Sequence, residues 1–319
     1  MMRFFAGLLL IFSVHAVHGQ AYPSKSIRML LAFPPGGPTD INARLFAQKL
    51  AEQTGQQVVV DNKPGAGGNL AATEAARAPA DGYTIFYNTS AITIAPALYS
   101  SIQYDPVKDF APVALTATVP LVLAVHPAVP AKSLQEFVAY AKANPGKLNY
   151  ASSGTGTITH LAAALFTAQI GLQMQHIPYK GSAPALVDVA GGQTQMMIDT
   201  ISTVLPYARD NRLRPLAVAM PRRLAVLPEV PTLEEAASLP GFEMSAWQGI
   251  VVPAATPRDV VARLNAEVNR AVQNPDLRQR LAAGGSEALG GTSEHYAAYI
   301  RSELARWTRV VKEAGAKAD

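Results

Sequence analysis

Two glycine-rich stretches carry the residues best suited to binding an anion. The first is Phe33-Pro34-Pro35-Gly36-Gly37-Pro38-Thr39-Asp40, which lies between an apolar run and an amphipathic run that begins at Ile41. This pattern predicts a turn from a strand into a helix, where the first helical N–H groups have no partner inside the helix. These groups and the helix dipole attract a carboxylate or a phosphate. The second stretch, Ser152-Ser153-Gly154-Thr155-Gly156-Thr157, repeats the order of strand, glycine loop and helix start.

The common catalytic motifs are missing from the sequence. It has no Gly-Lys-Ser/Thr phosphate loop, no Gly-x-Ser-x-Gly elbow, no His-Glu-x-x-His and no cysteine. Thr159 stands where a dinucleotide fingerprint beginning at Gly154 would need its third glycine. The histidines after the first twenty residues are not spaced as metal ligands: His126, His160, His176 and His295. We therefore expect no catalytic residue, no cofactor and no metal site.

Five side chains near these stretches have two interpretations each. His160 could face a ligand or pack within its helix, and Asp40 could reach a ligand or cap a helix. Asp199 follows an apolar strand, so it needs a partner, either a ligand amine or hydroxyl or the N–H groups of the next turn. Lys180 could contact an anion or lie in solvent. Trp247 could form a wall of the cleft or belong to the core.

Strands and helices alternate along most of the chain, which is typical of α/β proteins with parallel sheets. Asn88-Thr89-Ser90 closes one such strand, at the edge where open sheets bind ligands. Residues 104–120 contain three prolines and are predicted to be irregular, and a helix is predicted to start after a Thr256 cap. The repeat of the glycine loop predicts two similar domains, the first formed by residues 20–121 and 248–319 and the second by residues 122–247. The C-terminal helices are expected to pack on the first domain.

The first residues have the features of a secretory signal peptide. Arg3 precedes an apolar run from Phe4 to Val14, which is too short to span a bilayer. We predict a signal peptide over residues 1–19, cleaved after Gly19 or Ala21, and a periplasmic location if a bacterium makes the protein. The absence of cysteine excludes disulfides and a lipid-modified N-terminal cysteine. A net charge of +4 with scattered basic residues gives no support to a nucleic-acid partner.

Several motifs together resemble the tripartite tricarboxylate transporter substrate-binding family, also called Bug proteins. The resemblance rests on the two stretches above and extends over nearly the whole chain after the leader. The other matching motifs are Asp61-Asn62-Lys63-Pro64-Gly65-Ala66-Gly67-Gly68-Asn69, Tyr179-Lys180-Gly181-Ser182-Ala183-Pro184-Ala185, Gly191-Gly192-Gln193, Met197-Ile198-Asp199 and Trp247-Gln248-Gly249.

The resemblance implies a two-domain periplasmic binding protein of the Venus-flytrap type, with a mainly parallel sheet in each domain. It implies that a small carboxylate (a dicarboxylate or tricarboxylate, an amino acid or an aromatic carboxylate) is held between the domains and delivered by a monomer to membrane transporter subunits. The expected ligand-binding residues are Phe33, Gly36, Gly37, Thr39, Asp40, Asn88, Thr89, Ser90, Ser152, Ser153, Gly154, Thr157, His160, Lys180, Asp199 and Trp247. The alternatives are a sensory binder that presents its closed form to a receptor, and an exported α/β enzyme.

Overall fold

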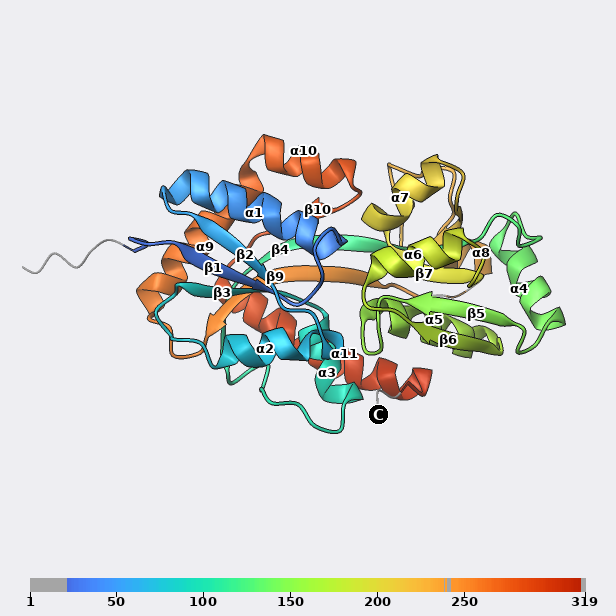
Figure 1. Ribbon diagram of the computed structural model, residues 1–319, viewed down its shortest axis with the longest axis horizontal. Helices are drawn as coiled ribbons and strands as arrows, with labels where there is room; N and C mark the ends of the chain where they lie inside the picture. The colour runs from blue at the N-terminus through green and yellow to red at the C-terminus, as the bar shows by residue number, and fades with distance from the viewer. Residues whose placement is uncertain (1–21, 238, 240–241, 317–319) are drawn as a thin grey trace, which may run out of the picture.

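The chain folds into two α/β lobes that lie side by side along the long axis of the molecule (Figure 1). The computed structural model describes residues 22–237, 239 and 242–316. The predicted signal peptide and both of its predicted cleavage sites lie outside these residues. The two lobes confirm the predicted fold class, an α/β periplasmic-binding-protein architecture.

In the first lobe a sheet is covered by helices on both faces. Its elements are β1 (Ile27–Leu31), α1 (Pro38–Thr54), β2 (Val58–Asn62), the 3₁₀ turn η1 (Ala66–Gly68), α2 (Asn69–Ala76), β3 (Thr84–Thr89), α3 (Ala91–Leu98), β4 (Phe110–Val125), β9 (Ser245–Pro253), α9 (Arg258–Gln273), α10 (Pro275–Ala283), β10 (Glu287–Ala288) and α11 (Ser293–Ala314). Side chains alternate across β1: Met29 and Leu31 pack with α1, α9 and α10, whereas Leu30 packs with α2, α3 and α11. This alternation produces one core on each face of the sheet.

The second lobe repeats this plan with fewer elements. They are α4 (Leu134–Ala143), β5 (Leu148–Ser152), α5 (Ile158–Ile170), β6 (Met174–Pro178), α6 (Ser182–Ala190), β7 (Met196–Thr200), α7 (Ile201–Arg209), β8 (Arg214–Val218) and α8 (Leu233–Ala237). The strand order is β6-β5-β7-β4-β8 here and β2-β1-β3-β9-β4 in the first lobe. β1 is parallel to β2 and β3, and β5 is parallel to β6 and β7. β4 and β9 run antiparallel to their neighbours.

Strand β4 joins the lobes and corrects the prediction of irregular structure for residues 110–120, whereas residues 104–109 lie outside the helices and strands as predicted. Residues 110–120 pair with β9, and from Leu121 the strand pairs with β7 instead. Proline lacks the N–H that a regular ladder needs, so it is placed at irregularities and strand ends. Pro112 lies at a register shift, and Pro120 forms the last pair with β9, opposite Ser245. The change of partner coincides with the predicted domain boundary near residue 121, which we keep as a proposal.

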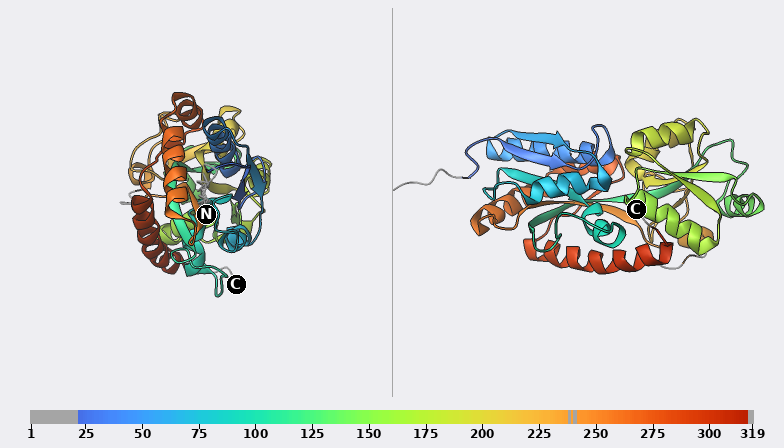
Figure 2. Two further views of the ribbon diagram at one scale, coloured as in Figure 1. Left: turned by 90° about the vertical axis from the view of Figure 1, so that its left-hand side faces the viewer. Right: turned by 60° about the horizontal axis from the view of Figure 1, so that its bottom comes forward.

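Helix α11 also joins the lobes, which corrects the expectation that all C-terminal helices pack on the first domain alone. Its first half places Tyr296 and Ile300 in the core of the first lobe. Its second half places Trp307 and Val310 in a core formed mainly by the second lobe. The right-hand view of Figure 2 shows this helix running beneath the sheet toward the second lobe. Three elements, β4, β9 and α11, therefore connect the two lobes.

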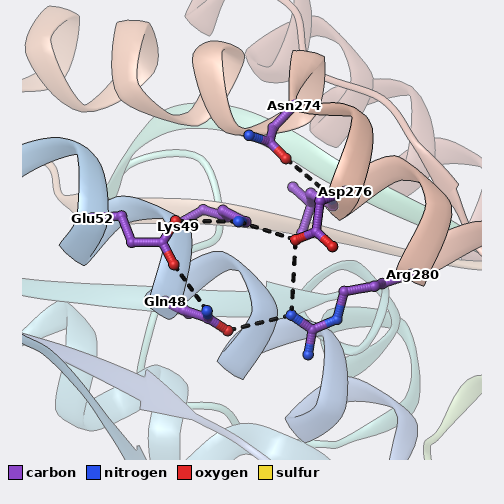
Figure 3. Close-up of polar contacts among 7 residues, drawn as sticks. Gln48, Lys49, Glu52, Asn274, Asp276 and Arg280 are labelled. Atoms are coloured by element: carbon purple, nitrogen blue, oxygen red, sulfur yellow. Dashed lines mark hydrogen bonds and ion pairs between the residues drawn. The ribbon is translucent and has the colours of Figure 1, made fainter.

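Surface polar contacts fix α10 against α1 (Figure 3). Lys49 Nζ lies 3.1 Å from a carboxylate oxygen of Glu52 and 3.0 Å from one of Asp276. Arg280 donates to Gln48 Oε1 at 3.3 Å. Water and salt screen pairs whose carboxylates are exposed, so we expect these contacts to orient α10 more than to stabilise it.

Side chains cap some of the helix starts. Thr232 and Glu235 form a capping box, in which each side chain accepts from the other residue's backbone N–H. The predicted Thr256 cap is wrong, because α9 begins after Pro257 and Thr256 Oγ1 has no hydrogen-bond partner.

Candidate functional site

A cavity between the lobes lies at the N-terminal ends of five helices. It has a volume of about 70 Å³, which is room for several waters or a small solute, because one water needs roughly 10–15 Å³ on this measure. Only two of the lining residues carry charged side chains, Lys180 and Asp199. The lining consists of Phe33, Pro34, Pro35, Gly37, Pro38, Thr39, Thr89, Ser90, Ala91, Ser153, Thr157, Ile158, Thr159, Lys180, Gly181, Ser182, Ala183, Pro184, Asp199, Thr200, Ala246 and Gln248.

The first glycine turn forms one wall of the cavity as predicted, through Phe33, Gly37 and Thr39. Gly37 is the N-cap of α1, with φ −80° and ψ 170°, and Pro38 occupies the first helical position. Proline suits this position because its missing N–H would have no helical partner there. Two predicted residues of the turn, Gly36 and Asp40, lie outside the lining.

Asp40 holds the turn in place and does not line the cavity. Its carboxylate accepts from Gly36 N at 3.0 Å, from Arg44 Nε at 2.9 Å and from Asn62 Nδ2 at 2.9 Å. Burial opposes ionisation of Asp40, but these hydrogen bonds prevail and lower its pKa. Neither predicted interpretation describes Asp40, because it does not line the cavity and the N-cap of α1 is Gly37, which has no side-chain cap hydrogen bond. Gly36 has φ +80°, which glycine adopts readily, and this lets its N–H point back at the carboxylate.

The second glycine loop contributes Ser153 and Thr157 from the opposite lobe. Thr157 is the N-cap of α5: its hydroxyl accepts from His160 N at 3.5 Å and donates to Gly154 O at 2.7 Å. Gly154 lies outside the cavity and lines a neighbouring groove. Ser152 is fully buried behind the loop, where its hydroxyl accepts from Gly154 N at 3.2 Å. Ser152 supports the loop and does not line the cavity.

His160 also supports the loop from behind. Its Nδ1 accepts from Gly156 N at 3.3 Å, and its ring stacks on His176 with the centroids 4.0 Å apart. His176 Nε2 lies 2.7 Å from Ser152 Oγ. Burial lowers the pKa of both histidines to about 4. At neutral pH His160 is therefore uncharged and can accept the Gly156 N–H, which fits the packed interpretation.

The end of β3 supplies two of the three residues predicted there. Thr89 and Ser90 line the cavity beside the start of α3. Asn88 is buried below them, where its Oδ1 accepts from Tyr296 OH at 2.8 Å. Side chains alternate along a strand, so Asn88 faces α11 while Thr89 faces the cavity.

Helices α6 and α7 add cavity residues that were missed, chiefly Gly181, Ser182 and Thr200. Both helices begin directly after strands β6 and β7, as α1 and α5 begin after β1 and β5. This shared order of strand, turn and helix was the signal that could have identified them. Lys180 lines the cavity as predicted, and its ammonium group makes no hydrogen bond or ion pair with another described residue.

Asp199 lies at the carboxyl end of β7, is fully buried and lines the cavity. Its Oδ1 accepts from Thr200 N at 2.7 Å, which is the N–H of the following turn. Its Oδ2 has no hydrogen-bond partner among the described residues. Both interpretations of Asp199 are thus compatible with the structure, one for each oxygen. Burial raises the pKa of Asp199 to about 6, although hydroxyl and backbone hydrogen bonds oppose the shift.

We expect Asp199→Asn to change how the stability of the unliganded protein depends on pH. A carboxyl group with a raised folded pKa binds a proton that the unfolded chain has released, so stability falls as pH rises from about 4 to about 6. The free energy of unfolding of Asp199→Asn minus that of the wild type should therefore increase by roughly 3 kcal/mol between pH 4 and pH 7. Urea unfolding measures it, and the titration of His160 and His176 cancels in the difference. Asp259→Asn, on the exposed surface of α9, is the control. If the difference in free energy of unfolding between Asp199→Asn and the wild type does not change with pH, the prediction is wrong.

Trp247 lies in the core and not in the cavity, in contrast to its predicted place in the site. It is 1% exposed, and its Nε1 donates to Glu303 on α11 at 2.8 Å. The next residue of β9, Gln248, points to the opposite face and lines the cavity. Gln248 is therefore a further site residue that the predicted set lacked. A glutamine within the otherwise apolar middle of β9 was the signal that could have revealed it.

A wider groove of about 660 Å³ adjoins the cavity. The two spaces share residues of the first turn and the second loop, including Phe33, Ser153 and Lys180. The groove is also bordered by the glycine-rich stretch at residues 64–68 and by Tyr99, whose hydroxyl donates to Thr155 O across the lobes at 3.2 Å. The groove lies outside the cavity, where the two lobes contact each other.

In residues 22–237, 239 and 242–316, no group of three or more His, Cys, Asp or Glu is placed to hold a metal ion. None of the helices in that part of the chain combines the length and the apolar character required to span a bilayer.

Known proteins resemble this chain over nearly its whole length. A family model described as the tripartite tricarboxylate transporter family receptor matches residues 42–316. The "UPF0065 protein in tcbD-tcbE intergenic region" of Pseudomonas sp. strain P51 is 41% identical over 98% of this chain and 94% of its own length. Protein BugT of Bordetella pertussis is 37% identical over 94% of this chain and 93% of its own length.

Solved structures of similar proteins share the fold of this chain. Rpa4515 of R. palustris, solved with adipate, superposes with a TM-score of 0.90 at 36% identity and covers 93% of this chain and 99% of its own. MatC of Rhodopseudomonas palustris, solved with bound malate, gives a TM-score of 0.86 at 35% identity, with 91% and 100% covered.

Proposed function

Because the chain belongs to the tripartite tricarboxylate transporter receptor family, we propose that it binds a small carboxylated solute in the interlobe cavity and delivers it to the membrane subunits of a tripartite transporter. The family comprises periplasmic solute-binding proteins and not enzymes, and the resemblance predicted from the glycine motifs is confirmed. The solute itself and the transporter subunits are part of the proposal.

The convergence of five helix N-termini on one cavity is the observation that supports a carboxylate ligand. The helices are α1, α3, α5, α6 and α7, and each has between 8 and 17 residues. Free N–H groups and the positive ends of the helix dipoles point toward an anion there. With Lys180 as the only cationic side chain in the lining, we propose that the backbone supplies most of the binding.

The remaining parts of the proposal concern export and closure. We propose that the leader is cleaved after Gly19 or Ala21, and that a monomer closes its two domains over the solute. The domains would be residues 20–121 with 248–319, and residues 122–247. A solute can favour the closed form only by its preference for that form, and residues of both lobes line the cavity. The adipate and malate in the similar structures suggest dicarboxylates as the first solutes to test.

We expect at least one carboxylate to stabilise the protein in a thermal-shift screen of monocarboxylates, dicarboxylates, tricarboxylates and amino acids. A ligand at 100 times its dissociation constant should raise the free energy of unfolding by about 2.7 kcal/mol. Isothermal titration would then give the stoichiometry, with one site per chain expected. Recovery of the solute unchanged after long incubation would agree with a binding protein, and turnover would favour the enzyme alternative. If no member of the panel binds and mass spectrometry shows that no solute has co-purified, the proposal is wrong.

A further inference from the structure

Gln248 is almost completely buried, at 1% exposure, and lines the cavity from the first lobe. Its Oε1 accepts from Asn42 Nδ2 at 2.9 Å and from Tyr87 OH at 2.9 Å. A carbonyl oxygen has two lone pairs, so these two donors saturate it. Its Nε2 donates to no other described residue, which leaves the NH₂ group for the cavity.

Buried neighbours fix this orientation of the amide. Thr116 Oγ1 donates to the Tyr87 hydroxyl at 3.0 Å, so the Tyr87 proton is directed at Gln248 Oε1. Thr116 and Tyr87 are fully buried and Asn42 is 4% exposed, which excludes water as a competing partner. The network therefore presents Gln248 to the cavity as a donor.

Asp199 presents an acceptor to the same cavity from the second lobe. Its Oδ2 is buried and makes no hydrogen bond of regular geometry with a described residue, whereas Thr200 donates to its Oδ1 from both N and Oγ1. The Ser182 hydroxyl also faces this carboxylate and favours its ionised form. An unpaired buried carboxylate oxygen is costly, so a ligand that donates to it removes a penalty of the free protein. One lobe thus offers a fixed donor and the other an unsatisfied acceptor.

We propose that Gln248 Nε2 and Asp199 Oδ2 select the solute, by requiring beside its anchored carboxylate a second polar group that both accepts and donates a hydrogen bond. This proposal rests on the proposed function. The group is an uncharged O–H: the hydroxyl of a hydroxycarboxylate, or the un-ionised carboxyl of a dicarboxylate bound as its monoanion. Each accepts from the Gln248 amide and donates to Asp199.

Other groups satisfy only one of the two residues. An ionised second carboxylate accepts from Gln248 but is repelled by Asp199, and an ammonium group donates to Asp199 but cannot accept from Gln248. A methyl group satisfies neither. Sites that hydrogen-bond a ligand hydroxyl reject the analogue that lacks it strongly, because the buried groups are then left unpaired.

The experiment compares hydroxy acids with the matching acids that lack the hydroxyl, at three chain lengths. Glycolate, 3-hydroxypropionate and 4-hydroxybutyrate are titrated against acetate, propionate and butyrate at one pH, with malonate, succinate and glutarate as the dicarboxylate arm. We expect at least tenfold tighter binding for one hydroxy acid, or for one dicarboxylate with uptake of a proton on binding. The first outcome identifies a hydroxyl and the second a shared carboxyl proton. Ratios below tenfold throughout would overturn the proposal.

Gln248→Glu is the sharpest variant. One oxygen of the new carboxylate still accepts from Asn42 and Tyr87, while the other replaces the donor by an acceptor. We expect at least 30-fold weaker binding of the preferred solute, and a lower urea midpoint than that of the wild type because the new carboxylate is buried. The double variant Gln248→Glu with Asp199→Asn exchanges donor and acceptor across the cavity and still has one amide and one carboxylate. Its affinity for the preferred solute should be at least tenfold higher than that of Gln248→Glu alone. Gln248→Glu binding as tightly as the wild type contradicts the proposal.

Tyr87→Phe provides a second test if Gln248→Glu does not fold. Tyr87 does not line the cavity, and its loss removes one of the two donors that fix the amide. We expect the preference for the hydroxy acid or dicarboxylate to fall three- to tenfold. The affinity for acids that lack the second polar group should not change. If the wild type binds no carboxylate, the proposed function has failed; if it binds carboxylates without this preference, only the role of Gln248 and Asp199 has failed.

Discussion

Gly37→Val should reduce carboxylate affinity at least 100-fold while the protein remains folded. Gly37 lines the cavity at the N-terminus of α1, and the absence of a side chain there lets an anion approach the helical N–H groups. The valine methyl groups would occupy that approach. A 100-fold loss corresponds to about 2.7 kcal/mol of binding free energy. Isothermal titration with the solute found in the carboxylate screen measures the loss.

The fold should tolerate this substitution. Gly37 has φ −80° and ψ 170°, which is extended backbone that valine adopts, and a Cβ added there would meet only Pro34 O at 3.7 Å. The cost is that of a poor N-cap residue, about 1 kcal/mol or less. Gly37→Ala should give an intermediate affinity.

Thr292→Val is the matched control for Gly37→Val. It removes the hydroxyl that caps α11 by accepting from His295 N, and Thr292 is not among the residues that line the cavity. It should lower stability by about 1 kcal/mol and leave affinity unchanged. Normal binding by Gly37→Val would show that the anion does not rest on the first turn.

The glycine turns were predictable because their signals are local. A strand, bare glycines and a helix start follow one another within about fifteen residues, and the structure places both predicted turns on one cavity through Gly37 and Thr157. The same order of strand, turn and helix start would have predicted Ser182 and Thr200 as cavity residues. The repeat of strand, loop and helix also predicted the repeated plan of the two lobes.

Residues whose roles depend on distant partners were not predictable. Asp40 and Asn88 have the chemistry of ligand-binding groups, but Asn62 engages the first and Tyr296 the second. Trp247 and Gln248 are adjacent and differ only in the face of β9 that each occupies, which depends on the placement of α11 and α1. The prolines of β4 suggested a loop, because the sequence does not reveal that they would lie at register shifts and at the change of partner strand.

Glu303→Ala should lower the free energy of unfolding by about 4 kcal/mol, the largest stability effect that we predict. Glu303 Oε2 accepts from Trp247 Nε1 at 2.8 Å and from Trp307 Nε1 at 2.9 Å. Both indoles are at most 1% exposed, so alanine would leave two buried N–H groups without partners. Each such group costs about 1–3 kcal/mol, and the lost side chain also leaves a cavity. Urea unfolding measures the change.

Glu303→Gln separates the loss of the acceptor from the loss of the charge. The glutamine oxygen can accept from both indoles, so only the ion pair with Arg306, 3.2 Å long and partly exposed, is removed. We expect a loss below about 1.5 kcal/mol. Glu313→Ala on the exposed face of the same helix should change stability by no more than about 0.5 kcal/mol.

The position of Glu303 gives this prediction a second readout. Trp247 belongs to a core of the first lobe and Trp307 to the core formed mainly by the second. The Glu303 carboxylate accepts from both indoles and therefore links the two cores at the helix that joins the lobes. These are the only two tryptophans of the chain, and their emission therefore reports on this junction directly. In Glu303→Ala we expect the emission to change before the main unfolding transition, because the junction loosens first. Equal stability of Glu303→Ala and Glu303→Gln would show that the two indole hydrogen bonds do not hold the lobes together.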